Sequence, residues 1–182
     1  MADTTPSLGP VLLAHARTAI AGRLKQAADS APDHPALHAP GASFVTLSLK
    51  GCLRGCIGQL EPVRSLGEDV RQNAIAAAFH DPRFLPLSLD EWPHIELEVS
   101  VLGPVQYTAC PSLAKCLEQI VPFEDGVILA SGVHRATFLP QVWEQLPEPE
   151  QFLAHLLTKA GLAAGTWPAN MKLGRYRVAH YA

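Results

Sequence analysis

A thiol and a guanidinium lie two residues apart in the segment Leu53-Arg54-Gly55-Cys56-Ile57-Gly58. A fixed positive charge near a thiol favours the thiolate, which is the nucleophilic form of cysteine. The planar guanidinium of an arginine also fits a carboxylate or a phosphate group. Glycine allows the backbone to approach a ligand or a neighbouring strand closely. The segment therefore predicts either a reactive Cys56 beside an anion-holding Arg54, or an inert buried cysteine, because small thiols are among the most buried side chains.

Two further polar groups interrupt apolar sequence, which is where functional sites are often found. The first comprises His80, Asp81 and Arg83, and the second is Gln141 in Leu139-Pro140-Gln141-Val142. From the residues alone, Asp81 and Arg83 are typical of a structural clamp on a turn, with His80 near the negative end of a helix. In a catalytic site, His80 is the expected proton carrier. A glutamine after proline is typical of a helix start.

Other polar patterns favour structural interpretations. His34 and His38 lie in a proline-rich loop, where no helix aligns them as metal ligands. Glu96 and Glu98 share one face of an alternating strand, which is either a paired carboxylate site or the solvated side of a sheet. The four cysteines fit neither a zinc site nor a redox Cys-x-x-Cys motif, so we expect no metal. On an extended strand Cys52 and Cys56 would lie ~13 Å apart, which is too far for a disulfide unless a turn at Gly55 brings them together.

Length and composition indicate one folded domain. The chain has 182 residues, of which 48% are hydrophobic and 17% charged, so a sizeable core is expected, with room for one small additional lobe. The net charge of −3 gives no basic surface for nucleic acid. The first residues resemble no secretory leader, and no apolar run reaches the ~20 residues of a membrane span. We therefore expect a cytoplasmic protein.

Hydrophobic periodicity predicts the elements of the first half of the chain. Helical spacing covers residues 11–28, and a loop follows over 31–41. Strands are expected at 42–49 and 53–57, joined as an antiparallel hairpin by Lys50-Gly51. Ser65 and Glu68 match a capping box that opens a helix to about His80, where Asp81-Pro82 ends it.

In the second half, strict alternation predicts a strand over residues 94–105. A short helix at 112–119, a hairpin of 126–130 with 134–139, a helix at 149–160 and a strand at 172–181 follow. Hairpins rather than repeated strand-helix-strand units connect the strands. The fold class is therefore α+β, with a mainly antiparallel sheet flanked by helices.

Several segments, in order along the chain, resemble the AMMECR domain family over roughly residues 10–180. These segments are Thr46 within 44–47, the hexapeptide 53–58, and residues 76–84, 98–102, 139–142 and 159–162. The resemblance implies one AMMECR-type domain over 8–182, with a larger lobe of sheet and helices. It also implies a smaller lobe at about 106–138 and a cleft between the lobes near the hexapeptide.

The resemblance further implies which residues line that cleft: Thr46, Arg54, Cys56, Asp81, Arg83 and Gln141. This chain departs from the family pattern at Asp125, where many relatives have histidine, and at Ala136, where they have glycine. A role of that histidine would be missing here.

Two functions agree with these observations. The first is an enzyme or enzyme subunit acting on a small organic substrate, with Cys56 as nucleophile or acid, Arg54 holding an anionic group and His80 carrying a proton. The family includes a bacterial protein of the AmmeMemoRadiSam system, so the resemblance implies a Memo-like protein and a radical S-adenosylmethionine enzyme as partners. This chain lacks the three-cysteine cluster of the latter, so no cofactor of its own is expected. The second function is a non-catalytic module that binds a ligand or a partner in the same cleft.

Overall fold

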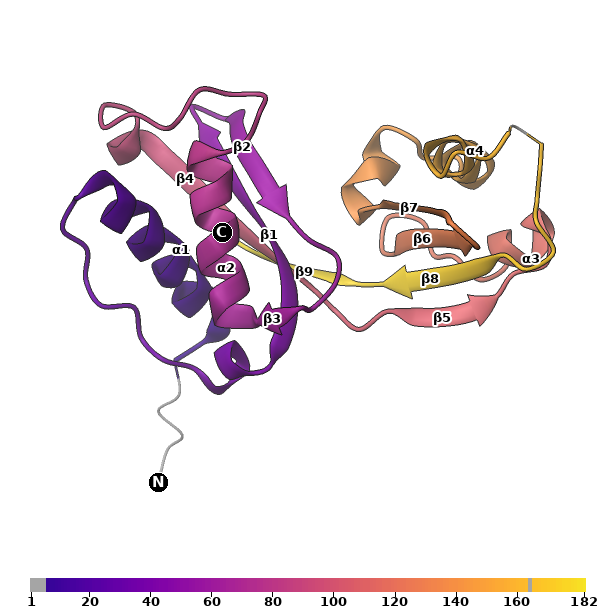
Figure 1. Cartoon of the computed structure of the whole chain (residues 1–182), viewed down its shortest axis with the longest axis horizontal. Helices are drawn as coiled ribbons and strands as arrows, with labels where there is room; N and C mark the ends of the chain where they lie inside the picture. Colours follow the sequence, from indigo (N-terminus) through magenta and orange to yellow (C-terminus); the bar gives the residue numbers. More distant parts are fainter. Residues whose placement is uncertain (1–5, 164) are drawn as a thin grey trace. The chain divides into compact units, whose positions relative to one another are not determined.

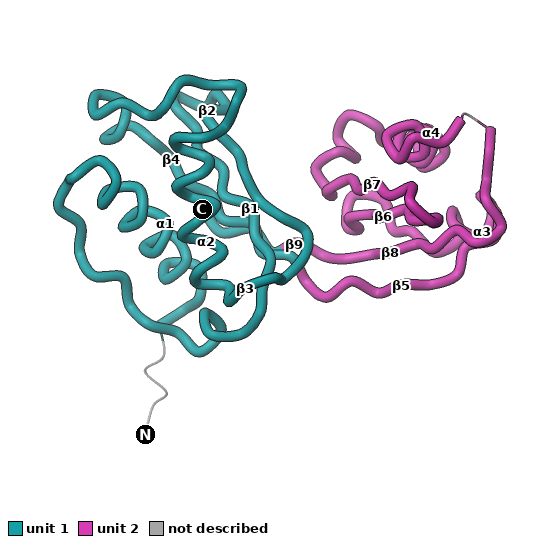
Figure 2. The backbone as a smooth tube through the Cα atoms, viewed as in Figure 1, with its two compact units in different colours: residues 1–102, 179–182 teal, residues 103–178 magenta. Residues whose placement is uncertain are grey.

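The computed structural model describes residues 6–163 and 165–182. Its contacts divide the chain into two compact units (Figure 2). Unit 1 comprises residues 1–102 together with 179–182, and unit 2 comprises residues 103–178. Unit 2 is therefore inserted, along the sequence, between the penultimate and the last strand of the unit 1 sheet.

Unit 1 is an antiparallel sheet with two helices packed on one face (Figure 1). The strand order is β2-β1-β4-β9, and the short β3 also pairs with β1. The strands are β1 (Pro40–Leu49), β2 (Cys52–Gly58), β3 (Arg64–Ser65), β4 (Ile95–Leu102) and β9 (Val178–Tyr181). The helices are α1 (Leu8–Leu24) and α2 (Leu66–Phe79), with the single turns η1 (Pro35–His38) and η2 (Trp92–His94).

The core of unit 1 lies between this sheet and its helices. Val45, Leu47 and Val99 alternate along β1 and β4 and are fully buried beneath α1 and α2. Small residues let α2 approach the sheet, since a Cβ on Gly55 of β2 would collide with the backbone carbonyl of Ala77. A glycine at position 55 is therefore required by the packing of α2 on β2.

The β1–β2 hairpin confirms the predicted turn at Lys50-Gly51. Both residues have positive φ, 53° and 75°, as a two-residue hairpin turn requires. The register places Thr46 directly opposite Cys56 on one side and opposite Glu98 of β4 on the other. This register sets which side chains share a face of the sheet.

Unit 2 has a second antiparallel sheet with the order β5-β8-β6-β7. Its strands are β5 (Gln106–Ala109), β6 (Gly126–Ser131), β7 (His134–Phe138) and β8 (Lys172–Tyr176). Its helices are α3 (Leu113–Leu117) and α4 (Pro149–Lys159), with the turn η3 (Pro140–Glu144). The core of the unit contains Trp143 stacked on Phe152, with ring centroids 3.7 Å apart.

The predicted α+β class with antiparallel sheets is confirmed, and several details differ from the prediction. Helix α1 ends at Leu24, because Lys25 takes a left-handed conformation with φ 55°. The capping box does not form, since Ser65 makes no capping bond with its side chain and Glu68 accepts hydrogen bonds from Arg71 and Gln72 instead.

The predicted strand at 172–181 is two strands, β8 and β9, which belong to different sheets. Unit 2 also extends from Gly103 to Val178, beyond the 106–138 expected for the smaller lobe. None of the helices in the described ranges has the length and apolar character of a membrane span.

Candidate functional site

Cys56 and Thr46 lie side by side on the face of the unit 1 sheet that α1 and α2 leave uncovered. Their neighbours Val45 and Leu47 are buried on the opposite face, and successive residues of a strand alternate between faces. The Thr46 hydroxyl donates a hydrogen bond to the Cys56 sulfur at 3.3 Å. We call the face that carries Thr46, Cys56, Glu98 and Ser100 the polar sheet face.

The backbone of Cys56 is fixed from the other side by Asp81 and Arg83. β2 is the edge strand of its sheet, so its outer backbone groups lack a neighbouring strand. The Cys56 N–H donates to the Asp81 carboxylate at 2.9 Å, and Arg83 Nη2 donates to the Cys56 carbonyl at 3.2 Å. Arg83 also makes two charged hydrogen bonds to Asp81, at 2.6 and 2.9 Å. This pair therefore satisfies the open edge of β2.

The hydrogen bond from Arg83 holds the pKa of Asp81 well below its usual range, although burial of the carboxyl acts in the opposite direction. The same bond raises the pKa of Arg83. Asp81 is therefore an anion, and Arg83 a cation, throughout the neutral pH range.

Arg54 is held by a carboxylate that lies far along the chain. Its Nε and Nη2 donate to the two oxygens of Glu91 at 2.7 and 3.0 Å, and Nη2 also donates to the Leu85 carbonyl at 2.9 Å. The Arg54 side chain is 12% exposed. The bond from Arg54 is the main cause that lowers the pKa of Glu91 to about 2. The bidentate surface of Arg54 is thus occupied by this protein's own carboxylate.

Phe84 connects the two arginines. The guanidinium carbon of Arg54 lies 5.7 Å from the Phe84 ring centroid, and that of Arg83 lies 5.5 Å from it. Both distances are within the range of cation–π attraction. The segment from Asp81 to Glu91 is therefore fastened to β2, and Thr46, Arg54, Cys56, Asp81 and Arg83 form one cluster.

Two residues predicted for the site lie apart from these contacts. His80 is exposed at the end of α2, where its backbone N–H donates to the Ala76 carbonyl. Within the described ranges, the His80 imidazole has no recorded hydrogen bond. Gln141 lies exposed in η3, which belongs to unit 2, whereas the cluster belongs to unit 1.

The polar sheet face also carries a histidine that the sequence did not single out. Ser100 Oγ lies 2.9 Å from Nδ1 of His180, and the same nitrogen lies 3.3 Å from the Glu98 carboxylate. Thr46 lies opposite Glu98 on one side and opposite Cys56 on the other. Glu98, Thr46 and Cys56 therefore form one row across the polar sheet face, which begins at His180. The alternation of apolar and polar residues along 95–101 predicted that the Glu98 side chain lies on the polar face of its strand. No sequence signal placed β9 beside β4.

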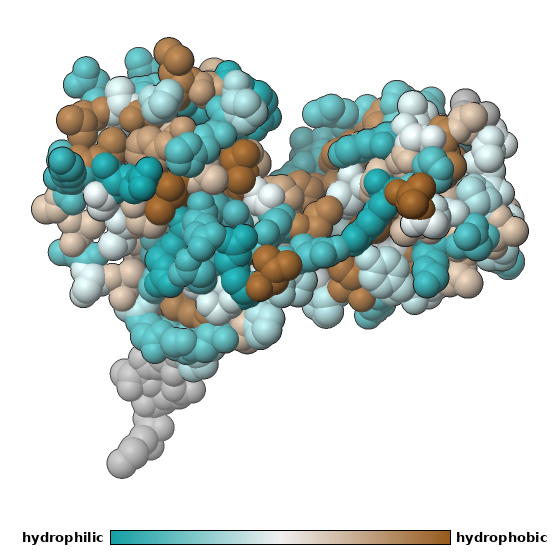
Figure 3. Space-filling view, viewed as in Figure 1, coloured by the Kyte–Doolittle hydropathy of each residue, from teal (hydrophilic) through white to brown (hydrophobic). Residues whose placement is uncertain are grey.

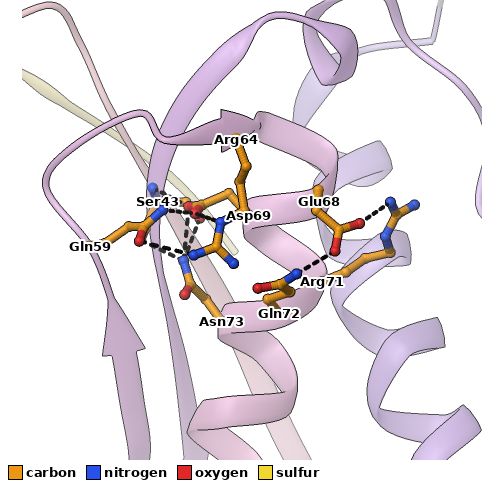
Figure 4. Close-up of polar contacts among 8 residues, drawn as sticks. All are labelled: Ser43, Gln59, Arg64, Glu68, Asp69, Arg71, Gln72 and Asn73. Carbon is orange, nitrogen blue, oxygen red and sulfur yellow. Dashed lines mark hydrogen bonds and ion pairs between the residues drawn. The ribbon is translucent and has the colours of Figure 1, made fainter.

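A buried polar network joins α2 to β1 and was also missed. The Asp69 side chain is fully buried and accepts the Ser43 N–H at 2.8 Å, the Ser43 hydroxyl at 2.7 Å and the Asn73 amide at 2.9 Å (Figure 4). Gln59 donates to the other oxygen, near Arg64. The sequence signal that could have revealed this network is the pair of polar residues Asp69 and Asn73, which lie four positions apart on the inner side of α2. All recorded contacts of this network are between residues of unit 1, so its role is structural: it holds α2 against β1.

In contrast to the buried network around Asp69, the outer surface over α2 is mostly hydrophilic (Figure 3).

The remaining cysteines differ from Cys56 in their surroundings. Cys52 is exposed, while burial raises the pKa of Cys110 and that of Cys116, both in unit 2. Among the residues that the structure describes, no three His, Cys, Asp or Glu side chains are grouped to hold a metal ion.

Comparison with known proteins identifies the family of this chain. The model of the AMMECR1 family matches residues 13–181. The chain belongs to the AMMECR1 family. The hexapeptide and the cluster around it lie within the matched range, as does His180.

Individual relatives are found in archaea. Protein MJ0810 of Methanocaldococcus jannaschii is 41% identical over 126 residues, which cover 68% of this chain and 63% of that protein. The match thus spans somewhat less than two thirds of that relative. A protein of Sulfolobus acidocaldarius is 36% identical over 173 residues, covering 91% of this chain and 76% of the relative.

The crystal structure of the uncharacterised protein PH0010 from Pyrococcus horikoshii has the same fold. Its TM-score is 0.79 at 33% identity, and the match covers 94% of this chain and 89% of PH0010. The fold described above is thus that of an AMMECR1-family protein.

Proposed function

We propose that this AMMECR1-family protein is an enzyme or enzyme subunit that acts on a small organic substrate at the polar sheet face of unit 1, with Cys56 as its reactive thiol. The observation that carries the proposal is the hydrogen bond from Thr46 to the Cys56 sulfur at 3.3 Å, on the face of the sheet that α1 and α2 do not cover. A donor aimed at sulfur stabilises the thiolate. Asp81 and Arg83 fix the Cys56 backbone and so hold the thiol in one position.

The contacts of the two arginines divide their roles. Glu91 and Leu85 occupy Nε and Nη2 of Arg54, and its Nη1 is buried without a recorded partner, so a substrate anion could reach Arg54 only by entering that buried space or by displacing an internal carboxylate. Arg83 is 53% exposed, and its three recorded side-chain bonds use Nε and Nη2 only. We therefore assign Arg83 to the substrate anion and Arg54 to the support of the 81–91 segment. Gln141 stays a proposal that rests on the family resemblance.

We assign proton transfer to His180 rather than to His80. Ser100 and Glu98 hold the Nδ1 side of the His180 ring, which leaves Nε2 directed away from these partners. His180 lies on the same face as Cys56 but three strands away, about 14 Å at ~4.8 Å per strand spacing. It would therefore serve a substrate group distant from the thiol, on a substrate that extends across this face, whereas His80 ends a helix. Reaction with diethylpyrocarbonate tests this: His180 should be modified readily and His15, whose Nε2 donates to the Pro32 carbonyl, should be protected. Protection of His180 would remove it from the proposal.

The proposed partners are a Memo-like protein and a radical S-adenosylmethionine enzyme, on the basis of the family resemblance. Co-purification with each of them tests this part separately from the chemistry at Cys56.

Alkylation with iodoacetamide at pH 7, followed by peptide mass spectrometry, tests the thiol. Cys52 is an internal control, since it is an exposed thiol on the same strand. We expect Cys56 to react about tenfold faster than Cys52, and Thr46→Val to remove most of that difference. A Cys56 that reacts no faster than Cys52 would contradict a catalytic thiol.

The second candidate is a non-catalytic binding module that uses the same face. It is favoured by the contacts of Cys56 in the described residues, where Thr46 is the recorded side-chain partner of the sulfur and no imidazole is. A nucleophilic site normally contains a base in contact with the nucleophile. Slow alkylation of Cys56 in a folded protein would support this second function.

A further inference from the structure

A cavity of unit 1 lies between α1 and the segment that follows it. Its volume is about 590 Å³, within the range of small-molecule sites. Small side chains form most of its wall, together with one cation, one anion and one aromatic ring. The lining residues are Ala14, Arg17, Thr18, Ala21, Ala27, Ala28, Asp29, Ser30, Pro32 and Trp92. We call this cavity the α1 groove.

Two hydrogen bonds shape the α1 groove. The Thr18 hydroxyl donates to the Asp29 carbonyl at 3.1 Å, and His15 Nε2 donates to the Pro32 carbonyl at 3.0 Å. Thr18 and His15 lie one turn apart on α1 and hold both ends of the following segment. The groove is thus formed without a ligand, which lowers the entropic cost of binding.

Arg17 is the positioned cation of the groove. Its guanidinium carbon lies 5.1 Å from the Trp92 ring centroid, and Nη2 donates to the Ile95 carbonyl at 3.3 Å. Within the described residues, Arg17 has no carboxylate partner. Four other arginines of unit 1 do, namely Arg54, Arg64, Arg71 and Arg83.

A guanidinium with a fixed position and unused N–H donors recognises a carboxylate well. The alanine side chains beside it offer contact to a compact apolar body. Asp29 adds one negative charge to the lining, which disfavours ligands with several negative charges. We propose that the α1 groove binds a small organic monocarboxylate, with its carboxylate on Arg17 and its apolar part against the alanines. This site is separate from the polar sheet face.

Titration of the full chain with phenylacetate, followed by amide NMR, tests the proposal. Phenylacetamide has the same shape without the charge and serves as the matched ligand. We expect phenylacetate to shift the amide signals of residues 14–32 and Trp92 in a saturable way, with phenylacetamide binding about tenfold more weakly. Equal binding of the two ligands, or shifts confined to other residues, would overturn the proposal.

Two variants locate the ligand. Arg17→Gln removes the charge, and Arg23→Gln makes the same change six residues further along α1, at a residue outside the groove lining. Only Arg17→Gln should weaken phenylacetate binding, by about tenfold. Ala28→Trp, at an exposed position, should block the groove without changing charge. Binding that survives both Arg17→Gln and Ala28→Trp in folded protein would overturn the assignment.

Discussion

The carboxylate of Asp81 takes the place of a neighbouring strand for Cys56. It accepts the outward N–H of Cys56 at 2.9 Å, and it holds Arg83 in position for the carbonyl of the same residue. One ion pair therefore serves as the missing ladder partner of an edge strand and fixes the residue that carries the thiol.

Asp81→Asn should lower the free energy of unfolding by about 2 kcal/mol at pH 7, because a buried charged acceptor of four hydrogen bonds is lost. The pKa of Asp81 is depressed in the folded state, so its contribution is present above its unfolded value of about 3.9 and is lost as the pH falls below it. Urea denaturation of both proteins between pH 7 and 3 measures this. A difference that stays constant as the pH falls would contradict the role of the charge.

Glu91→Gln should cost about 1 to 2 kcal/mol of stability at pH 7, since it breaks the bidentate pair with Arg54. Arg54 lowers the pKa of Glu91 to about 2. The stabilisation is therefore complete above the unfolded value of about 4.3 and disappears as the pH falls toward 2. A double-mutant cycle with Arg54→Met, followed by urea denaturation, should show a coupling of about 1 kcal/mol or more. Additive effects of the two substitutions on stability would show that Arg54 and Glu91 do not stabilise the protein as a pair.

Asp69→Ala should destabilise unit 1 by about 3 kcal/mol or more, because it leaves the buried Ser43 and Asn73 donors without their acceptor. Glu68→Ala is the matched control, one residue earlier and on the solvated side of α2. It should change stability by less than about 0.5 kcal/mol. Melting temperatures that fall equally for the two variants would show that the buried contacts of Asp69 add no more stability than the exposed contacts of Glu68.

Gly55→Ala should destabilise the protein by about 2 kcal/mol or more, since the added methyl group meets the Ala77 carbonyl and pushes α2 away from β2. Gly22→Ala adds the same group on α1, where nothing lies within 4 Å of the new Cβ. It should stabilise by about 0.5 to 1 kcal/mol through helix propensity. Chemical denaturation compares the two, and a neutral Gly55→Ala would contradict the close packing.

Local patterns in the sequence predicted much of the local structure, but not all of it. Lys50-Gly51 predicted its hairpin, and alternation over 94–105 predicted β4 with one polar face, although Ser100 on that face is buried. The Ser65–Glu68 capping box failed because Arg71 and Gln72, one turn further along α2, compete for the Glu68 carboxylate.

Contacts between distant residues could not be predicted in this way. Glu91 meets Arg54 across 37 positions, and His180 meets Ser100 across 80. Asp69 on α2 reaches Ser43 across 26 positions. Such pairs depend on how the elements pack, which neither periodicity nor spacing encodes. The hexapeptide indicated where Cys56 and Arg54 lie, but not that Arg54 already has a carboxylate partner.

The insertion of unit 2 before β9 has a consequence for synthesis on the ribosome. β1, β2 and β4 emerge early, yet the strand that completes their sheet emerges only after all of residues 103–177. The nascent first half therefore exposes the β4 edge until the final strand arrives. His180 reaches Glu98 and Ser100 only at that moment, so the polar sheet face is assembled last.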